Sequence, residues 1–355
     1  MEKTAQASKD LFEKYNYGDL IIELFEDPIL GEDGDLTETR NYAEYILAFD
    51  EGAERKYEFI KPGIKPGRIV DIGCETGSIL KQMSNDQRIR ESDLYGIEVS
   101  RKLYSLCEQR KENGEFGHDH VFFYQRNIVK NKIFSDNSID TFTALSLTHE
   151  LESYVGRETL LAFIKQIYEQ LAPGGMFINY DVTGPGQKDK VVYMELTKDD
   201  GITDGWDKLF DDKQGGQVKT FLESLSTYAR FLRFAKDFRS DEGYELSFTE
   251  EVVDGKSVIK LRAVDAAEFL SKKDYTNNWY SEMHETFCFW SFADWKMELE
   301  KVGFNLQGDS RVFTNEWVVS NRYEGKVMLY EMDESGRLVH IPYPPTNVVL
   351  YAQKV

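Results

Sequence analysis

Apolar runs alternate with amphipathic helical patterns through the first half of the chain. Between residues 61 and 184, strand-like runs are separated by segments in which apolar residues recur with a helical spacing. The runs that we interpret as strands lie within residues 68–71, 94–99, 121–128, 138–147 and 171–181. This alternation predicts an α/β fold, in which a mostly parallel sheet binds its ligand at the carboxyl ends of the strands.

The first of these strands leads into a turn that is suited to a ligand. It stops at Asp71, and Gly73 and Gly77 follow before a helix that begins at Ser78. Glycines let a ligand approach the backbone closely, and the start of a helix presents unpaired N–H groups. A dinucleotide site would have G-x-G-x-x-G directly after the strand, and an acid at this place would repel a phosphate. An NAD-dependent oxidoreductase is therefore disfavoured, and a ligand with a cationic group is favoured.

The turn resembles the first motif of the class I S-adenosylmethionine (SAM) dependent methyltransferases, which is commonly Asp/Glu-x-Gly-x-Gly-x-Gly. Glu75 stands where the middle glycine usually lies. Later features follow in the order that is usual for this family, since Glu98 ends the second strand, Asn127 follows the third, and a Pro-Gly-Gly turn at 173–175 precedes the fifth. The resemblance implies a Rossmann-like, mostly parallel seven-stranded sheet with helices on both faces, and SAM as the cofactor.

The resemblance also implies where the cofactor binds. Asp71, Gly73 and Gly77 are expected to shape the methionine end of the site, and Asn127 is expected to face the adenine amino group. Glu98 is expected to hold the ribose, because a carboxylate can accept hydrogen bonds from two vicinal hydroxyls. The complete set of expected cofactor-binding residues is Asp71, Gly73, Cys74, Glu75, Gly77, Glu98, Val99, Asn127, Ile128, Leu145 and Ser146.

The chain of 355 residues is longer than a usual single domain, so additions to the core are expected. The expected parts are an N-terminal helical roof at 1–60, the SAM-binding core at 61–184, a cap insertion at 185–290, and the end of the core sheet at 291–355 with a short insertion at 315–346. In the roof, helices are expected at 7–15, 20–25 and 41–59.

The cap is expected to mix helices and strands. A long apolar stripe predicts one helix over 219–238, and Asp254-Gly255 predicts a hairpin turn. After the cap, a helix that ends at Gly303 leads into a strand at 305–313, and the last strand is expected at 347–354. The stiff, proline-rich insertion at 315–346 is expected to support the cap.

His149 is the best-placed candidate for a catalytic base, because it follows the fourth strand, where the family's substrate-facing motif lies. Glu150 is expected to orient His149 or to act as the base itself. The alternative is that His149 only caps a helix or holds the edge of the cofactor. Further candidates for substrate contact are Tyr42, Asp181, His284 and Trp290, and for the aromatic residues and His284 ordinary packing is the competing interpretation. No set of residues has metal-ligand spacing, so no metal is expected.

Composition narrows the partners. With 63 acidic and 43 basic side chains, the formal net charge is −20 at pH 7, which opposes binding to nucleic acid. The three cysteines form no C-x-x-C pair and fit a reducing cytosol. No stretch approaches the length of an apolar membrane-spanning helix and no secretory signal is visible, so a cytoplasmic protein without membrane contact is expected.

The sequence therefore predicts a SAM-dependent methyltransferase that acts on a small-molecule methyl acceptor enclosed between core and cap. One alternative is methylation of a protein or peptide side chain, which needs an open groove. Another is a non-catalytic SAM-binding protein, which Glu75 in the glycine turn suggests. The acceptor atom and the oligomeric state are left open.

Overall fold

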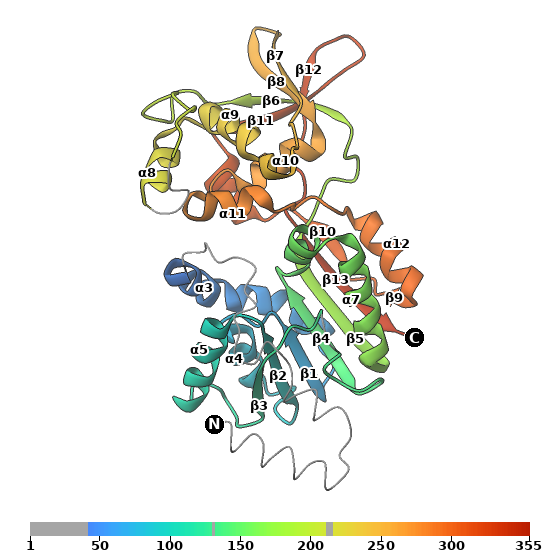
Figure 1. Cartoon of the computed structure of the whole chain (residues 1–355). Coiled ribbons are helices and arrows are strands. Elements are labelled where there is room, and N and C mark those ends of the chain that lie inside the picture. The colour runs from blue at the N-terminus through green and yellow to red at the C-terminus, as the bar shows by residue number, and fades with distance from the viewer. Residues whose placement is uncertain (1–41, 130–131, 211–215) are drawn as a thin grey trace.

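Two lobes make up the protein, an α/β core and a smaller cap (Figure 1). The computed structural model describes residues 42–129, 132–210 and 216–355, with the backbone alone for 42–49. The helices expected at 7–15 and 20–25, and the side chain of Tyr42, lie outside the described residues.

The core is built on one twisted sheet with the strand order β10-β13-β5-β4-β1-β2-β3. Its five parallel strands are β1 (Arg68–Ile72), β2 (Asp93–Glu98), β3 (Val121–Gln125), β4 (Ile139–Leu145) and β5 (Leu171–Val182). Its antiparallel end consists of β13 (Asn347–Lys354), which pairs with β5, β9 (Phe304–Leu306) and β10 (Arg311–Phe313). The expected fold class is confirmed. The sheet has eight strands, because the single strand expected at 305–313 is split into β9 and β10.

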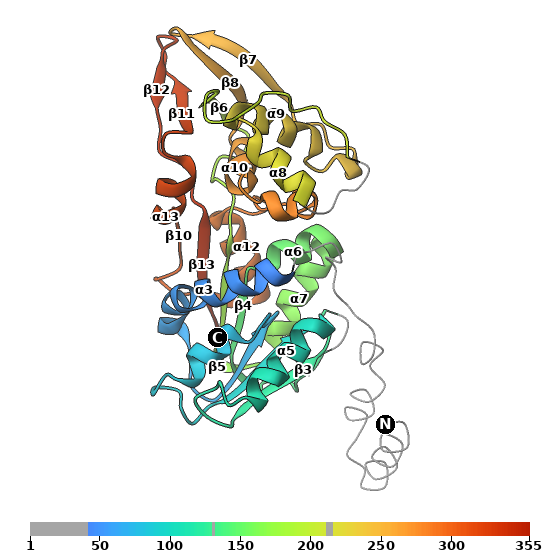
Figure 2. The same ribbon diagram turned by 90° about the vertical axis from the view of Figure 1, so that its left-hand side faces the viewer.

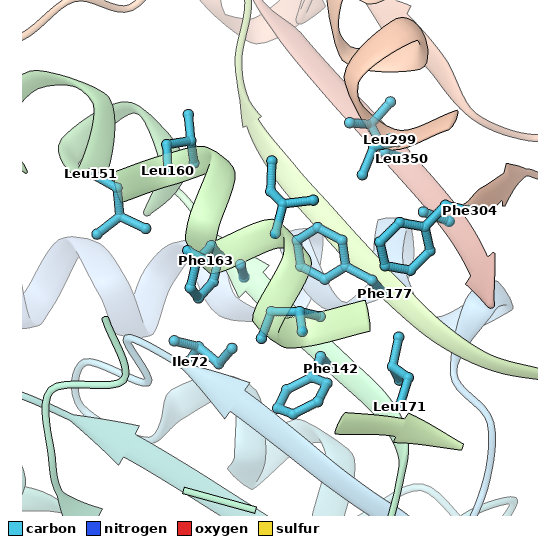
Figure 3. Close-up of a cluster of buried hydrophobic side chains, with 14 of the residues drawn as sticks. Ile72, Phe142, Leu151, Leu160, Phe163, Leu171, Phe177, Leu299, Phe304 and Leu350 are labelled. Carbon is cyan, nitrogen blue, oxygen red and sulfur yellow. The ribbon is translucent and has the colours of Figure 1, made fainter. Parts of the chain in front are cut away.

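Helices cover both faces of this sheet. One face carries α3 (Tyr42–Ile60), α4 (Ser78–Ser84) and α5 (Arg101–Glu112), and the other carries α7 (Arg157–Gln170) and α12 (Phe292–Val302). In Figure 3, Leu160 and Phe163 of α7 lie over Phe142 and Phe177 of the sheet. Because the strands are buried on both faces, most of their side chains are apolar, with Thr141, Thr143 and Asn179 as buried polar exceptions.

The carboxyl ends of β1 to β5 form one edge of the sheet, which we call the carboxyl edge. After β4 the chain continues through α6 (Thr148–Glu150) and a turn of π-helix, η2 (Leu151–Val155). The carboxyl edge faces the cap, and α3 crosses between the two lobes (Figure 2).

The cap contains a second sheet, antiparallel throughout, with the order β12-β11-β6-β8-β7. Its strands are β6 (Val191–Leu196), β7 (Phe248–Val253), β8 (Lys256–Arg262), β11 (Val327–Met332) and β12 (Leu338–His340). One face packs against α8 (Gly216–Ser224), α9 (Thr227–Asp237), α10 (Ala263–Lys272) and α11 (Trp279–His284). The short elements are η1 (Lys61–Gly63), η3 (Ser240–Glu242), η4 (Thr276–Asn278), α13 (Glu316–Val318) and η5 (Val319–Tyr323).

The insertion at 315–346, which was expected to support the cap, supplies two strands of the cap sheet. β11 pairs directly with β6, so segments more than a hundred residues apart share one ladder. Within the described parts of the chain, none of the helices combines the length and apolarity that a membrane crossing needs.

Local signals in the cap and after it were mostly interpreted correctly. The hairpin turn at Asp254 and Gly255 is confirmed, and both residues have the positive φ that such a turn requires. A capping box at Ser291 starts α12, and Gly303 ends it with φ 115°. The single helix predicted over 219–238 is wrong. The chain breaks between α8 and α9, because the Ser226 side chain accepts a hydrogen bond from the Ala229 N–H and begins a new helix.

Candidate functional site

The turn between β1 and α4 has the conformation that a glycine-rich ligand loop requires. Gly73, Glu75 and Gly77 have φ values of 66°, 54° and 74°, all in the left-handed region. The N–H groups of Gly73 and Cys74 donate to the Ile97 carbonyl at 2.8 and 3.1 Å, which fixes the turn against β2. Glu75 thus lies in the left-handed region that glycine adopts most readily. The turn therefore forms without a glycine at this position.

Two buried acids lie at the carboxyl edge beside this turn. Asp71 is 2% exposed and accepts a hydrogen bond from the Thr143 hydroxyl at 2.6 Å. Glu98 is 5% exposed and accepts from the N–H groups of Glu75 at 2.9 Å and Ser100 at 2.8 Å. Among the described residues, neither acid has an ion-pair partner within 4.0 Å.

Burial changes the protonation of both acids. Loss of solvation raises the pKa of Asp71 to about 7, although the Thr143 hydrogen bond and the charge of Lys56 oppose the rise. Loss of solvation likewise raises the pKa of Glu98 to about 8, against the N–H groups of Ser100 and Glu75. A ligand that brings a cationic group to Asp71 would restore its charged form.

A pocket opens directly above Asp71, with an empty volume of about 290 Å³, open solvent included. Of the residues expected to bind the cofactor, Asp71, Gly73, Cys74, Glu75 and Leu145 line it. Four further lining residues were not predicted: Ala53, Lys56, Ser78 and Ile79. Ser78 stands at the start of α4, directly after the turn. No local motif marks Lys56, because it reaches the pocket from α3, which only the fold brings to this edge.

Helix α3 is fastened over the carboxyl edge by Asp50. Its carboxylate accepts hydrogen bonds from Arg110 at 2.9 and 2.6 Å and from Thr76 at 3.3 Å. The Ser78 hydroxyl donates to it as well. The roof helix is therefore joined to the start of α4 and, through Arg110, to α5.

The other expected cofactor residues lie at the same edge with differing orientations. Gly77 precedes α4 as its N-cap, and Val99 is half-buried after β2. The Asn127 side-chain oxygen accepts from the Val129 N–H at 3.0 Å, so this oxygen is used locally. The Ile128 side chain belongs to the buried cluster under α7. Ser146 has φ 55° and donates its N–H to the Tyr180 carbonyl at 2.8 Å.

The predicted base, His149, is buried against Asp181 at the end of β5. Its Nδ1 lies 2.6 Å from Asp181 Oδ1, and its backbone N–H donates to Asp181 Oδ2 at 3.1 Å. The Thr148 hydroxyl also donates to Asp181 Oδ2, at 2.5 Å. Asp181, which the sequence assigned to substrate contact, therefore orients His149.

The other side of His149 meets Glu285, which the sequence did not single out. Its Nε2 lies 3.5 Å from Glu285 Oε2, and Glu285 is 1% exposed in the segment that returns from the cap. The Tyr154 hydroxyl donates to Glu285 Oε1 at 3.0 Å and lies 3.1 Å from the Ser281 hydroxyl. We call Asp181, His149 and Glu285 the junction, because they join core and cap.

The junction acids hold His149 as a cation. Burial lowers the pKa of His149, but the charges and hydrogen bonds of Asp181 and Glu285 outweigh it and keep the pKa well above the usual value. Burial raises the pKa of Asp181, but His149 and Thr148 outweigh it, so that the pKa is lowered overall. An imidazolium between two carboxylates donates protons and does not accept them in this arrangement.

Two further residues that the sequence singled out, Glu150 and Trp290, are not part of the junction. Glu150 is half-buried on α6. Trp290 is 3% exposed, with its ring 4.6 Å from that of Trp295 and the Arg157 guanidinium 4.8 Å from its centre. This environment favours the packing interpretation of Trp290.

His284 is partly exposed on α11, and its Nδ1 lies 2.7 Å from Asp241 Oδ2. Together with Glu242, these side chains bring possible metal-ligand atoms within 4.8 Å of one another. Glu242 is already paired with Arg239, and Asp241 with His284. The absence of a metal remains a prediction.

The strand order, the left-handed turn after β1 and the acids at the ends of β1 and β2 define a Rossmann-like methyltransferase domain of class I. Residues 70–177 match the family model of a methyltransferase domain. The chain thus contains a methyltransferase domain over these residues, and such a domain uses SAM as its cofactor. A comparison with curated protein sequences found no match.

Solved structures with a related arrangement include three SAM-dependent methyltransferases. The protein from Mesorhizobium loti is 12% identical and has a TM-score of 0.44, over 86% of this chain and 100% of that chain. The protein from Clostridium acetobutylicum is 12% identical with a TM-score of 0.42, over 88% and 98%. The protein from Methanosarcina mazei is 14% identical with a TM-score of 0.40, over 83% and 96%. These likenesses are loose, and the assignment rests on the domain match and the geometry of the carboxyl edge.

Proposed function

We propose that the protein transfers the methyl group of SAM to a small molecule held between the carboxyl edge and the cap. The observation that supports this proposal most is the junction, where His149 of the core meets Glu285 of the cap's return segment. Bound SAM supplies an electrophilic methyl group. The chain's own residues then have to position the acceptor and exclude water.

The junction favours an acceptor that attacks with an existing lone pair. His149 is held protonated between Asp181 and Glu285, so it is poorly prepared to remove a proton from an alcohol. Both ring nitrogens of His149 already face junction carboxylates, so the group offered to an acceptor is Glu285, which can accept a hydrogen bond from an N–H group. The carboxylates of the junction also disfavour an anionic acceptor. A neutral amine meets both conditions, because its lone pair attacks the methyl group as the bond from sulfur to methyl breaks, and the methylated product is an ammonium that keeps its protons. We propose an amine as the acceptor class.

The test is a methyl-transfer screen with labelled SAM against amine, alcohol and carboxylate libraries and against a cell extract divided into small-molecule and protein fractions. We expect label in amines and in the small-molecule fraction. Label confined to the protein fraction would contradict the proposal and favour side-chain methylation.

His149→Ala, measured on the acceptor that the screen finds, should lower turnover with little change in SAM affinity. The matched control is His120→Ala, since His120 lies in an exposed loop before β3 and should leave turnover unchanged. Full activity of the His149 variant would remove the junction from the account of catalysis.

A further inference from the structure

The cofactor pocket is lined by a positively charged side chain, Lys56, that no sequence motif predicts. Lys56 lines the pocket from α3, on the same cavity as Asp71 and the glycine turn. Its charge is felt at Asp71, where it lowers the pKa against burial. The lining of this one pocket therefore contains both a carboxyl group, that of Asp71, and an ammonium group, that of Lys56.

Among the described residues, the ammonium group of Lys56 has no bonded partner. No ion pair within 4.0 Å or hydrogen bond holds its ammonium there, whereas nearby Lys61 pairs with Glu58 at 3.3 Å. Lys56 is half-buried, so its charge is only partly solvated. A half-buried cation beside a ligand pocket, without a protein anion in contact, is suited to an anionic group of the ligand.

The helix that carries Lys56 is held in place before any ligand binds. Asp50 fastens it to Arg110, and the Tyr57 hydroxyl donates to Asp86 at 2.6 Å. The Tyr351 hydroxyl of β13 donates to the Phe59 carbonyl. With attachments on both sides of residue 56, the backbone that carries Lys56 is held beside the pocket in advance, which reduces the entropic cost of binding an anion there.

We propose that Lys56 binds the α-carboxylate of the cofactor and so determines the preference for SAM over analogues that lack this group. The methionine end of SAM carries an ammonium and a carboxylate on one carbon. A pocket that recognises it needs an acid and a base within one small space, and Asp71 and Lys56 meet this requirement. The proposal depends on the cofactor and is independent of the acceptor.

The competing explanation is that Lys56 only balances the charge of Asp71. The two explanations predict different effects of removing Lys56 on the affinity for a ligand that lacks the carboxylate. If Lys56 contacts the carboxylate, its removal weakens SAM and leaves the decarboxylated analogue unaffected. If Lys56 only supports Asp71, its removal weakens both ligands equally.

The experiment is calorimetric titration of the wild type, Lys56→Met and Lys56→Arg with SAM and with decarboxylated SAM. Lys61→Met is the matched control, because it removes a neighbouring cation outside the pocket. We expect the wild type to prefer SAM by about tenfold to a hundredfold, the range for a hydrogen bond to a charged group. Lys56→Met should lose this preference by weakening SAM alone, Lys56→Arg should keep most of it, and Lys61→Met should match the wild type.

Equal weakening of both ligands in Lys56→Met would overturn the proposal in favour of charge balance. A wild type without preference between the ligands would also overturn it. A wild type that binds neither ligand would contradict the cofactor assignment and this inference with it, whereas a failure to find an amine acceptor would leave the titration result unaffected.

Discussion

The cofactor pocket and the junction each bury carboxylates, but their electrostatics are opposite. Asp71 in the pocket is held by a hydroxyl, and Glu98 beside the glycine turn is held by backbone N–H groups. Burial raises the pKa of each. Asp181 at the junction faces an imidazolium, and its pKa is lowered. Asp71 therefore still lacks a cationic partner, which a ligand can supply, whereas the acids of the junction already face an imidazolium of the protein.

This difference predicts that the pocket contributes mainly to SAM binding and the junction mainly to the stability of the fold. Substitutions at the pocket should weaken SAM while leaving the unliganded fold intact. Substitutions at the junction should destabilise the fold, because they leave a buried charge without its partner.

The largest effect is expected just beyond the junction, where its segment enters the core. Trp290→Ala should lower the free energy of unfolding by about 3 to 5 kcal/mol, because it empties a space packed by Trp295 and Arg157. Urea denaturation without SAM measures this, and Trp317→Ala is the control, since Trp317 is 53% exposed. A Trp290 variant as stable as the control would restore a role in acceptor binding.

A smaller effect is expected from Glu285→Gln, which keeps an acceptor for Tyr154 and removes the charge opposite His149. It should lower the pKa of His149 and cost about 1 to 3 kcal/mol of stability. The two measurements are the NMR titration of His149 and unfolding as a function of pH.

The sign of the pH dependence follows from the raised pKa of His149. Its contribution to stability is fully present below the ordinary value of 6.5 and is lost as the pH rises through the higher folded-state value. The cost of Glu285→Gln should therefore be greatest in acid and shrink at alkaline pH. A cost that does not depend on pH would mean that His149 is not charged in the folded protein.

The smallest effect is expected in the pH dependence of SAM binding. Because the ligand ammonium needs ionised Asp71, binding should release protons, and affinity should rise by about tenfold in total from about pH 6 to about pH 8. Asp71→Asn should make this profile flatter. Constant affinity over the range in the wild type would show that Asp71 is already ionised or is not involved.

The same raised pKa values make an opposite prediction for the unliganded protein. Between the ordinary Asp pKa of 3.8 and about 7, the folded state binds more protons at Asp71 than the unfolded state does. The contribution of this residue to stability therefore falls as the pH rises. SAM should stabilise the protein most at the alkaline end.

Local signals in the sequence were sufficient to predict where several helices and strands begin or end. The acids at the ends of β1 and β2, the cap at Ser291 and the hairpin at Asp254 each depend on neighbouring residues, so the sequence contains the reason for them. The break before α9 was missed, although Ser226 followed by Thr227 is a recognisable cap.

Features that depend on contacts between distant segments could not be predicted from the sequence. Pairing of β11 with β6 completes the cap sheet, but no periodicity identifies a strand's partner. Glu285 was missed for the same reason, because it reaches His149 from more than a hundred residues along the chain. Lys56 lies closer to Asp71 in the sequence, but no periodicity shows which side chains of α3 line the pocket. His149 and Asp181 were both singled out, but the hydrogen bond between them became visible only when β4 and β5 were placed side by side.

The most direct test of the contrast makes the same substitution at both places. Asp71→Asn and Asp181→Asn are compared for SAM affinity by calorimetry and for stability by urea denaturation at neutral pH. Asp71→Asn should weaken SAM by about 1.5 to 3 kcal/mol, since it loses a charge-assisted contact, and should be at least as stable as the wild type. Asp181→Asn should lose about 3 kcal/mol of stability and bind SAM nearly normally when folded. If both variants lost stability alike while Asp71→Asn kept its affinity for SAM, the contrast between a ligand-dependent pocket and a self-satisfied junction would be wrong.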